Sequence, residues 1–191
     1  PLHELRVHTT GVDLKSFAEA APRTSLEATF TGRAIGTQSL AGSITAANAL
    51  PGPVDKDALP VHALRSRISL SPEAIQLEDA HVDLGPAGVL EGSARLAPEG
   101  IDLEFVTSRL DLRPIHSAVR STHLAGSANV RLESGQQIVH AELAQDDLAA
   151  TADARLADKV LTFDRLVLRS REASFDSSGR ITLADAYPYA V

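Results

Sequence analysis

Apolar and polar residues alternate, with one two-residue slip, in the stretch Ile75-Gln76-Leu77-Glu78-Asp79-Ala80-His81-Val82. Successive side chains of a β-strand point to opposite faces, so a period of two places the apolar groups on one face. A β-bulge at Glu78-Asp79 would return the later apolar residues to that same face. The stretch therefore predicts an antiparallel strand with one apolar and one polar side.

The same alternation extends over most of the chain. It occurs at Leu26-Ala28-Phe30, at Ile101-Leu103-Phe105 and at Ala128-Val130-Leu132, among others. Turn signals such as Pro98-Glu99-Gly100 separate the runs, and strands joined by short turns form antiparallel hairpins. We therefore expect an all-β fold of roughly a dozen strands, built as an elongated, curled antiparallel sheet with an apolar concave face.

Helical signals are scarce. Residues 16–21 and 114–119 each predict one or two short helical turns, because Pro22 ends the first stretch and Pro114 suits a first helical position. Residues 51–60 contain three Pro and the charged run Asp55-Lys56-Asp57, which predicts an exposed loop and not a domain boundary. We expect residues 1–191 to be a single segment of a longer β-groove array.

Two loose internal repeats support an array. Val12-Asp13-Leu14-Lys15 followed by Thr24 matches Leu110-Asp111-Leu112-Arg113 followed by Thr122 at an offset of 98 residues. The stretch 75–82 matches 161–168 at an offset of 86, and both contain the slip; Gly92 is then expected to match Gly179. Repeated hairpins indicate a sheet that extends by addition.

Composition limits the functions that the chain can have. The 191 residues carry a formal net charge of −7, which disfavours nucleic-acid binding, and the absence of Cys excludes thiolate chemistry and disulfides. The seven His lie outside any metal-ligand spacing, and no nucleophile elbow or phosphate-binding loop is present. We therefore predict that the chain is not an enzyme, with no catalytic residue, no metal and no cofactor.

The alternation alone leaves three architectures open, because a sheet with one apolar face can pack against a second sheet, close into a barrel or curl into a trough that another molecule fills. Aromatic residues make up only 4% of the chain. Small residues occupy many inward positions and leave space, which favours the trough, although they also permit close packing of two sheets. These positions are Ala28, Ala46, Ala94, Ala128, Ala152 and Ala154.

The hairpin modules, separated by elements such as Leu110-Asp111-Leu112-Arg113-Pro114-Ile115, resemble the repeats of the TamB/AsmA-like family over about residues 5–185. The resemblance implies a β-taco, or repeating β-groove, in a periplasmic protein that is anchored in the inner membrane of Gram-negative cells by a segment outside this chain. It also implies passage of phospholipid acyl chains between the inner and outer membranes. Assistance in outer-membrane protein assembly and a TamA-like outer-membrane barrel partner are implied as well.

The apolar positions of the alternating strands are the predicted lipid-groove residues. An aliphatic wall can hold an acyl chain without directed contacts, because burial of each methylene contributes about 0.8 kcal/mol. The set is Leu77, Val82, Leu84, Leu96, Leu103, Phe105, Val130, Leu132, Leu143, Leu156, Phe163, Leu166, Leu168, Ile181 and Leu183.

Two other functions remain open. A sheet with unpaired edges could act as a chaperone-like scaffold that templates client strands by β-augmentation. The chain could also be a structural β-sandwich module without lipid binding. Because an open sheet has two exposed edges, we further expect the isolated chain to associate edge to edge.

Overall fold

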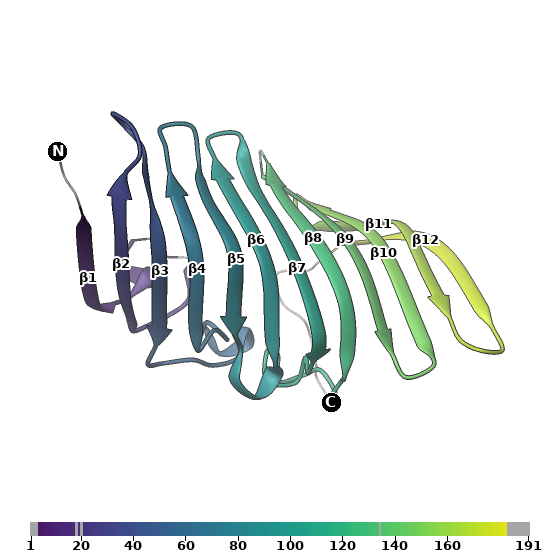
Figure 1. The fold of residues 1–191 in the computed structure, drawn as a ribbon. Helices are drawn as coiled ribbons and strands as arrows, with labels where there is room; N and C mark the ends of the chain where they lie inside the picture. The colour runs from purple at the N-terminus through teal and green to yellow at the C-terminus, as the bar shows by residue number, and fades with distance from the viewer. Residues whose placement is uncertain (1–3, 18, 20, 134, 183–191) are drawn as a thin grey trace.

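The computed structural model describes residues 4–17, 19, 21–133 and 135–182. It is a single antiparallel sheet in which twelve strands follow one another in chain order, so each strand pairs with its neighbours in sequence (Figure 1). The strands are β1 Leu5–Val12, β2 Leu26–Ala34, β3 Leu40–Asn48, β4 Ala63–Leu70, β5 Ile75–Asp83, β6 Val89–Ala97, β7 Gly100–Leu110, β8 Leu124–Glu133, β9 Gln136–Gln145, β10 Leu148–Ala157, β11 Val160–Arg169 and β12 Ser174–Thr182.

The sheet is open and curved, and the described residues form no second sheet that covers it (Figure 1). A compact protein of 20.2 kDa would expose about 8,800 Å², whereas this chain exposes 12748 Å². Among the described residues no large side chain is completely buried, and the buried apolar residues are only Ile68, Leu84, Val167 and three Ala. The elongated, curled sheet is therefore confirmed, and the sandwich alternative is wrong for this part of the chain.

The slips in the alternation are β-bulges. The pairing of β5 with β6 shifts between Leu77 and Ala80, and the pairing of β11 with β12 shifts between Phe163 and Leu166. Asp79 takes the positive φ of 49° at the first bulge. Both shifts keep the flanking apolar residues on one face, as the sequence predicts.

The register extends the internal repeat to six strands, β1–β6 and β7–β12. The pairing of β1 with β2 shifts between Thr9 and Val12, and that of β7 with β8 shifts between Thr107 and Leu110, so the offset of 98 holds in space. One expected match is wrong. Leu77 pairs with Ala94, and its equivalent in the second repeat, Phe163, pairs with Gly179. Gly179 therefore corresponds to Ala94 and not to Gly92, because pairing at the β11 bulge sets the register of β12.

The repeat also duplicates a hydrogen-bonded clasp between successive strands. The Asp13 carboxylate accepts from the backbone N–H groups of Lys15 and Thr24, while the Thr24 hydroxyl donates to Val12 O and accepts from Leu14 N–H. The Asp111 carboxylate and the Thr122 hydroxyl form the same four bonds with Arg113, Thr122, Leu110 and Leu112. Each clasp closes the loop that returns the chain to the next strand.

The short helical turns of the described residues lie in connections between strands. The 3-10 helices of the described residues are η1 Leu14–Ser16, η2 Val54–Lys56 and η3 Gly85–Ala87. The first begins two residues before the expected stretch 16–21, of which residues 18 and 20 lie outside the described residues. In the second expected stretch, His116 N–H donates to Leu112 O and closes one helical turn.

The connections that follow β1, β3 and β7 are long, and they contact one another at one end of the sheet. Arg23 N–H donates to Asp57 O at 2.9 Å, and Val54 N–H donates to Ile115 O at 2.9 Å. Ser117 N–H donates to the Asp55 carboxylate at 2.9 Å. Loops that belong to strands far apart in the sheet thus meet, which requires the curvature of the sheet between them.

Loss of the Thr24 hydroxyl should destabilise the fold. Thr24 is 3% exposed, and Thr24→Val would leave the Leu14 N–H without its acceptor. We expect the free energy of unfolding to fall by about 1–3 kcal/mol in urea titrations. Thr29→Val, which removes only an exposed hydrogen bond to His8, is the control and should change it by less than about 0.5 kcal/mol. Equal effects of the two variants would contradict a structural role of the clasp.

The clasp also predicts an acid-dependent step. The hydrogen bond from Ser121, followed by those from Arg113 and Thr122, lowers the pKa of Asp111 from its ordinary 3.8 to about 2. A lowered folded-state pKa means that the stabilisation is complete above pH 3.8 and is lost as the pH falls through about 2. Carboxyl-carbon NMR should show this titration, and Ser121→Ala should raise the pKa. An unshifted Asp111 pKa would contradict the clasp.

Candidate apolar groove

One face of the sheet carries a continuous apolar surface. Directly paired residues share a face, and the pairs Leu77–Ala94, Ala94–Leu103, Leu103–Val130 and Val130–Val139 link five successive strands through apolar side chains. Further along, Ala154 pairs with both Val139 and Phe163. We call this surface, which reaches from β1 to β12, the apolar face.

Thirteen of the fifteen predicted groove residues lie in strands of this face. All of these except Ile181, which is 52% exposed, are half-buried. Leu84 lies just beyond the end of β5 and is 5% exposed, so it is packed in a turn and not available at an open surface. Leu183 lies outside the described residues.

A partly enclosed region of the apolar face forms a cavity of about 280 Å³ between strands β2–β7 and the loop that follows β3. Only four of the predicted groove residues, Leu77, Val82, Leu103 and Phe105, line it. Leu26 and Leu64 line it as well, and the alternation of their strands could have placed them in the set. Leu59 and Val61 complete the wall from the loop, where no periodicity identifies them.

The loop 49–62 therefore differs from its expected form in one respect. Its centre, Val54–Asp57, is exposed, but the flanking residues 51–53 and 58–62 are half-buried. Asn48 holds the start of the loop, since its side-chain oxygen accepts from Ser25 N–H and Leu50 N–H. The loop thus covers part of the apolar face in the first repeat.

In the described part of the second repeat, no equivalent loop covers the apolar face. The equivalent connection there, between β9 and β10, has two residues, 146–147, whereas the connection between β3 and β4 has 14. This difference accounts for most of the fall in the repeat offset from 98 to 86. Leu143, Leu156, Phe163 and Leu168 in the second repeat consequently line an open surface, where each is only half-buried.

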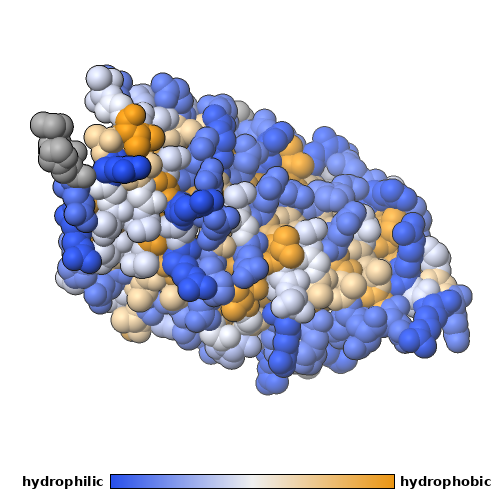
Figure 2. All heavy atoms as spheres, in the orientation of Figure 1, coloured by the Kyte–Doolittle hydropathy of each residue, from blue (hydrophilic) through white to orange (hydrophobic). Residues whose placement is uncertain are grey.

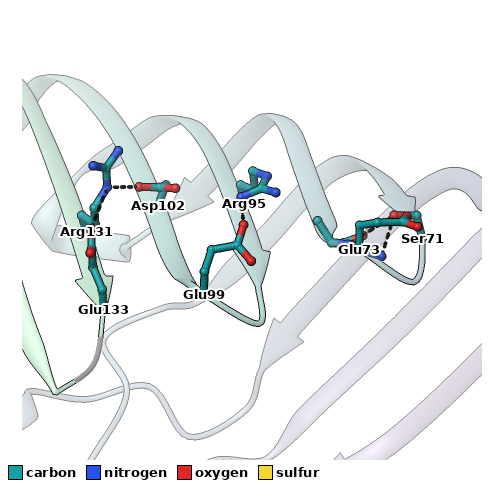
Figure 3. Close-up of polar contacts among 8 residues, drawn as sticks. Ser71, Glu73, Arg95, Glu99, Asp102, Arg131 and Glu133 are labelled. Atoms are coloured by element: carbon teal, nitrogen blue, oxygen red, sulfur yellow. Dashed lines mark hydrogen bonds and ion pairs between the residues drawn. The ribbon is translucent and has the colours of Figure 1, made fainter.

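The opposite face carries ion pairs between neighbouring strands. The Arg131 side chain donates to Asp102 at 2.6 Å and lies near Glu133, and Arg95 donates to Glu99 at 2.9 Å (Figure 3). In the space-filling view, hydrophilic side chains extend along the whole sheet with separate hydrophobic patches between them (Figure 2). All of these charges are well exposed, so they add solubility and little stability.

His140 lies on this face and has a raised pKa. The hydrogen bond between its Nδ1 and the Asp153 carboxylate, at 2.6 Å, is the main cause, and the nearby charges of Asp153 and Glu142 add to it. His140 and Asp153 lie on the solvent side of β9 and β10, away from the apolar face. Their hydrogen bond is therefore a surface interaction and gives the groove no chemistry.

Within the described ranges, no group of three or more His, Asp or Glu side chains is placed to hold a metal ion. No helix in the described part of the chain has the length and apolar character needed to cross a bilayer. The chain matches no protein-family model, no curated protein and no solved structure.

A charge placed in the cavity wall should destabilise the protein. Val61→Asp would bury a carboxylate among aliphatic side chains, and we expect the free energy of unfolding to fall by about 1–3 kcal/mol. Val54→Asp in the same loop is the control, because Val54 is 49% exposed, and its effect should stay within about 0.5 kcal/mol. Urea unfolding followed by circular dichroism measures both. Equal effects would contradict the packing of the loop on the apolar face.

Proposed function

We propose that this chain is a lipid-carrying segment of a periplasmic bridge protein of the TamB/AsmA-like kind. The observation that carries the proposal is the apolar face, which continues through all twelve strands and which no second sheet of the described residues covers. Such a face is costly in water, and large exposed apolar surfaces in soluble proteins mark binding sites. The inner-membrane anchor and the TamA-like barrel partner are part of the proposal because the family resemblance implies them.

The occupant that suits this face is an acyl chain. The face presents aliphatic side chains and Ala over a long path, with no ion pair or metal cluster on it within the described residues. A flexible hydrocarbon chain needs no directed contact, and burial of each methylene contributes about 0.8 kcal/mol. Similar walls in successive strands would let the chain move along the sheet, since no position binds it much more tightly than the next.

The partly enclosed cavity is too small for a whole phospholipid. Its volume of about 280 Å³ lies below the ~300–1,000 Å³ of sites that enclose drug-sized ligands. We therefore assign it at most one segment of an acyl chain. The open face of β8–β12 is the larger surface and would hold the rest of the lipid, with the head group in water.

Strand templating is the second candidate function. Exposed edge strands favour it, because β1 pairs only with β2 and β12 only with β11 among the described residues. A client strand could add to either edge through its backbone. Lipid transport would depend on the polarity of the apolar face, whereas templating would depend on the backbone of the edges.

Charges on the apolar face should remove lipid binding. Leu103→Arg in β7 and Leu168→Asp in β11 each place a charge on the apolar face, and we expect loss of phospholipid that co-purifies with the chain, measured by native mass spectrometry and lipid extraction. Val106→Arg is the matched control, because Val106 lies next to Phe105 on the opposite face and is 57% exposed.

The control should retain lipid at the level of the unchanged chain, and circular dichroism should show the same β-sheet content in all variants. In the full-length protein the same two substitutions should stop phospholipid transfer. Unchanged lipid content in Leu168→Asp, or an equal loss in Val106→Arg, would contradict the proposal.

A further inference from the structure

We propose that the loop 49–62 is a lid that opens and closes over the apolar face of β2–β7, and that the contacts of its tip, Val54–Asp57, are the latch that holds it closed. The lid deepens the proposed function and rests on it in one respect, because it would regulate access of the acyl chain to this part of the face. Its opening can be measured without lipid, so the lid and the lipid function can fail separately.

Two residues of the lid complete the wall of the cavity. Leu59 and Val61 come from the lid, and the other lining residues all belong to strands β2–β7. The lining is apolar except for Asn48 and Ser93, so the cavity offers water few hydrogen-bonding partners. Leu59 and Val61 are therefore the part of the wall that can move while the sheet stays in place.

The base of the lid is firmly attached to the sheet. Asn48 N–H donates to His62 O at 2.8 Å, and His62 N–H donates to Asp83 O at 2.8 Å. Within the lid, Gly52 N–H donates to Leu59 O at 3.2 Å and joins its two halves. The lid can therefore rotate about its base as one piece, without unfolding.

The latch at the tip consists of exposed hydrogen bonds. Val54 N–H donates to Ile115 O at 2.9 Å. The Asp55 carboxylate accepts from Ser117 N–H at 2.9 Å and also from the Ser117 hydroxyl. Because residues 54–57 are all exposed, water competes for these bonds and each contributes little net stability. A contact held in this way opens more easily than a packed segment.

The segments that receive the tip are held in place. The connection after β7, which contacts Val54 and Asp55, is closed by one Asp–Thr clasp. The connection after β1 is closed by the other clasp, and its Arg23 N–H donates to Asp57 O at 2.9 Å. Because both receiving segments are braced, release of the tip moves the lid and leaves the sheet unchanged.

Thiol labelling can measure the opening, because the chain contains no Cys. Ala94→Cys places one thiol in the cavity wall, and Ala152→Cys places one on the apolar face of β10, where the described residues form no such lid. A water-soluble maleimide should label position 152 faster than position 94. Asp55→Ala removes the carboxylate of the latch and should speed labelling at position 94 about three- to tenfold, with no change at position 152.

Lys56→Ala is the matched control, because Lys56 is an exposed neighbour in the same 3-10 turn, and it should leave both rates unchanged. Ser117→Ala should also speed labelling at position 94. Combined with Asp55→Ala it should add nothing, because the hydroxyl acts through that carboxylate. Circular dichroism should show the same β-sheet content in all variants.

Three labelling results would overturn the lid. The first is equal rates at position 94 in Asp55→Ala and Lys56→Ala. The second is equal acceleration at positions 94 and 152, which would show that the whole sheet loosens. The third is labelling of position 94 as fast as position 152 while the latch is intact, which would show that nothing covers the cavity.

Vesicles of phosphatidylethanolamine and phosphatidylglycerol separate the lid from the lipid function. A bound acyl chain should shield the Ala94→Cys thiol, and the shielding should develop faster in Asp55→Ala than in Lys56→Ala. No shielding in either variant, with the difference in labelling retained, would contradict lipid binding at this site and support the lid alone. Shielding that develops at the same rate in both variants would overturn the regulation of lipid access by the lid.

Discussion

The structure depends on one constraint, which is that a single sheet has two faces and only one of them is polar. Alternation with a period of two concentrates the apolar side chains on one side, and the described residues form no second sheet to cover them. The low burial follows from this arrangement: most groove side chains remain half-buried, and the completely buried large side chain that marks a closed core is missing from the described residues. A bound apolar molecule is a direct way to complete such a surface.

The bulges maintain this constraint along the chain. Without the bulge at Asp79, regular alternation after Leu77 would place Ala80 and Val82 on the charged face. The equivalent bulge in β11 keeps Leu166 and Leu168 with Phe163. The Asp–Thr clasps act on the connections between strands, because they fix the loops that follow β1 and β7 in the two repeats. Register and connection are thus repeated together.

Much of the fold follows from the sequence because a period of two and turn residues are local signals. The strands, the bulges near residues 78–79 and 164–165 and the match between Asp13 and Asp111 could be predicted in this way. The packing of Leu59 and Val61 could not, because a loop with three Pro and several charges gives no periodic signal. The match between Gly179 and Ala94 also required the structure. A shift of the repeat by two residues keeps each side chain on the same face, so the alternation does not reveal it.

Small-angle X-ray scattering, extrapolated to zero concentration, tests the central claim that the chain is one uncovered sheet. A compact domain of this length would have a radius of gyration of about 16 Å. Twelve strands side by side span roughly 53 Å at about 4.8 Å per step. We therefore predict a clearly larger radius of gyration and a longest dimension that exceeds this span. A value near that of a compact domain would show that the sheet folds onto itself and would contradict the account.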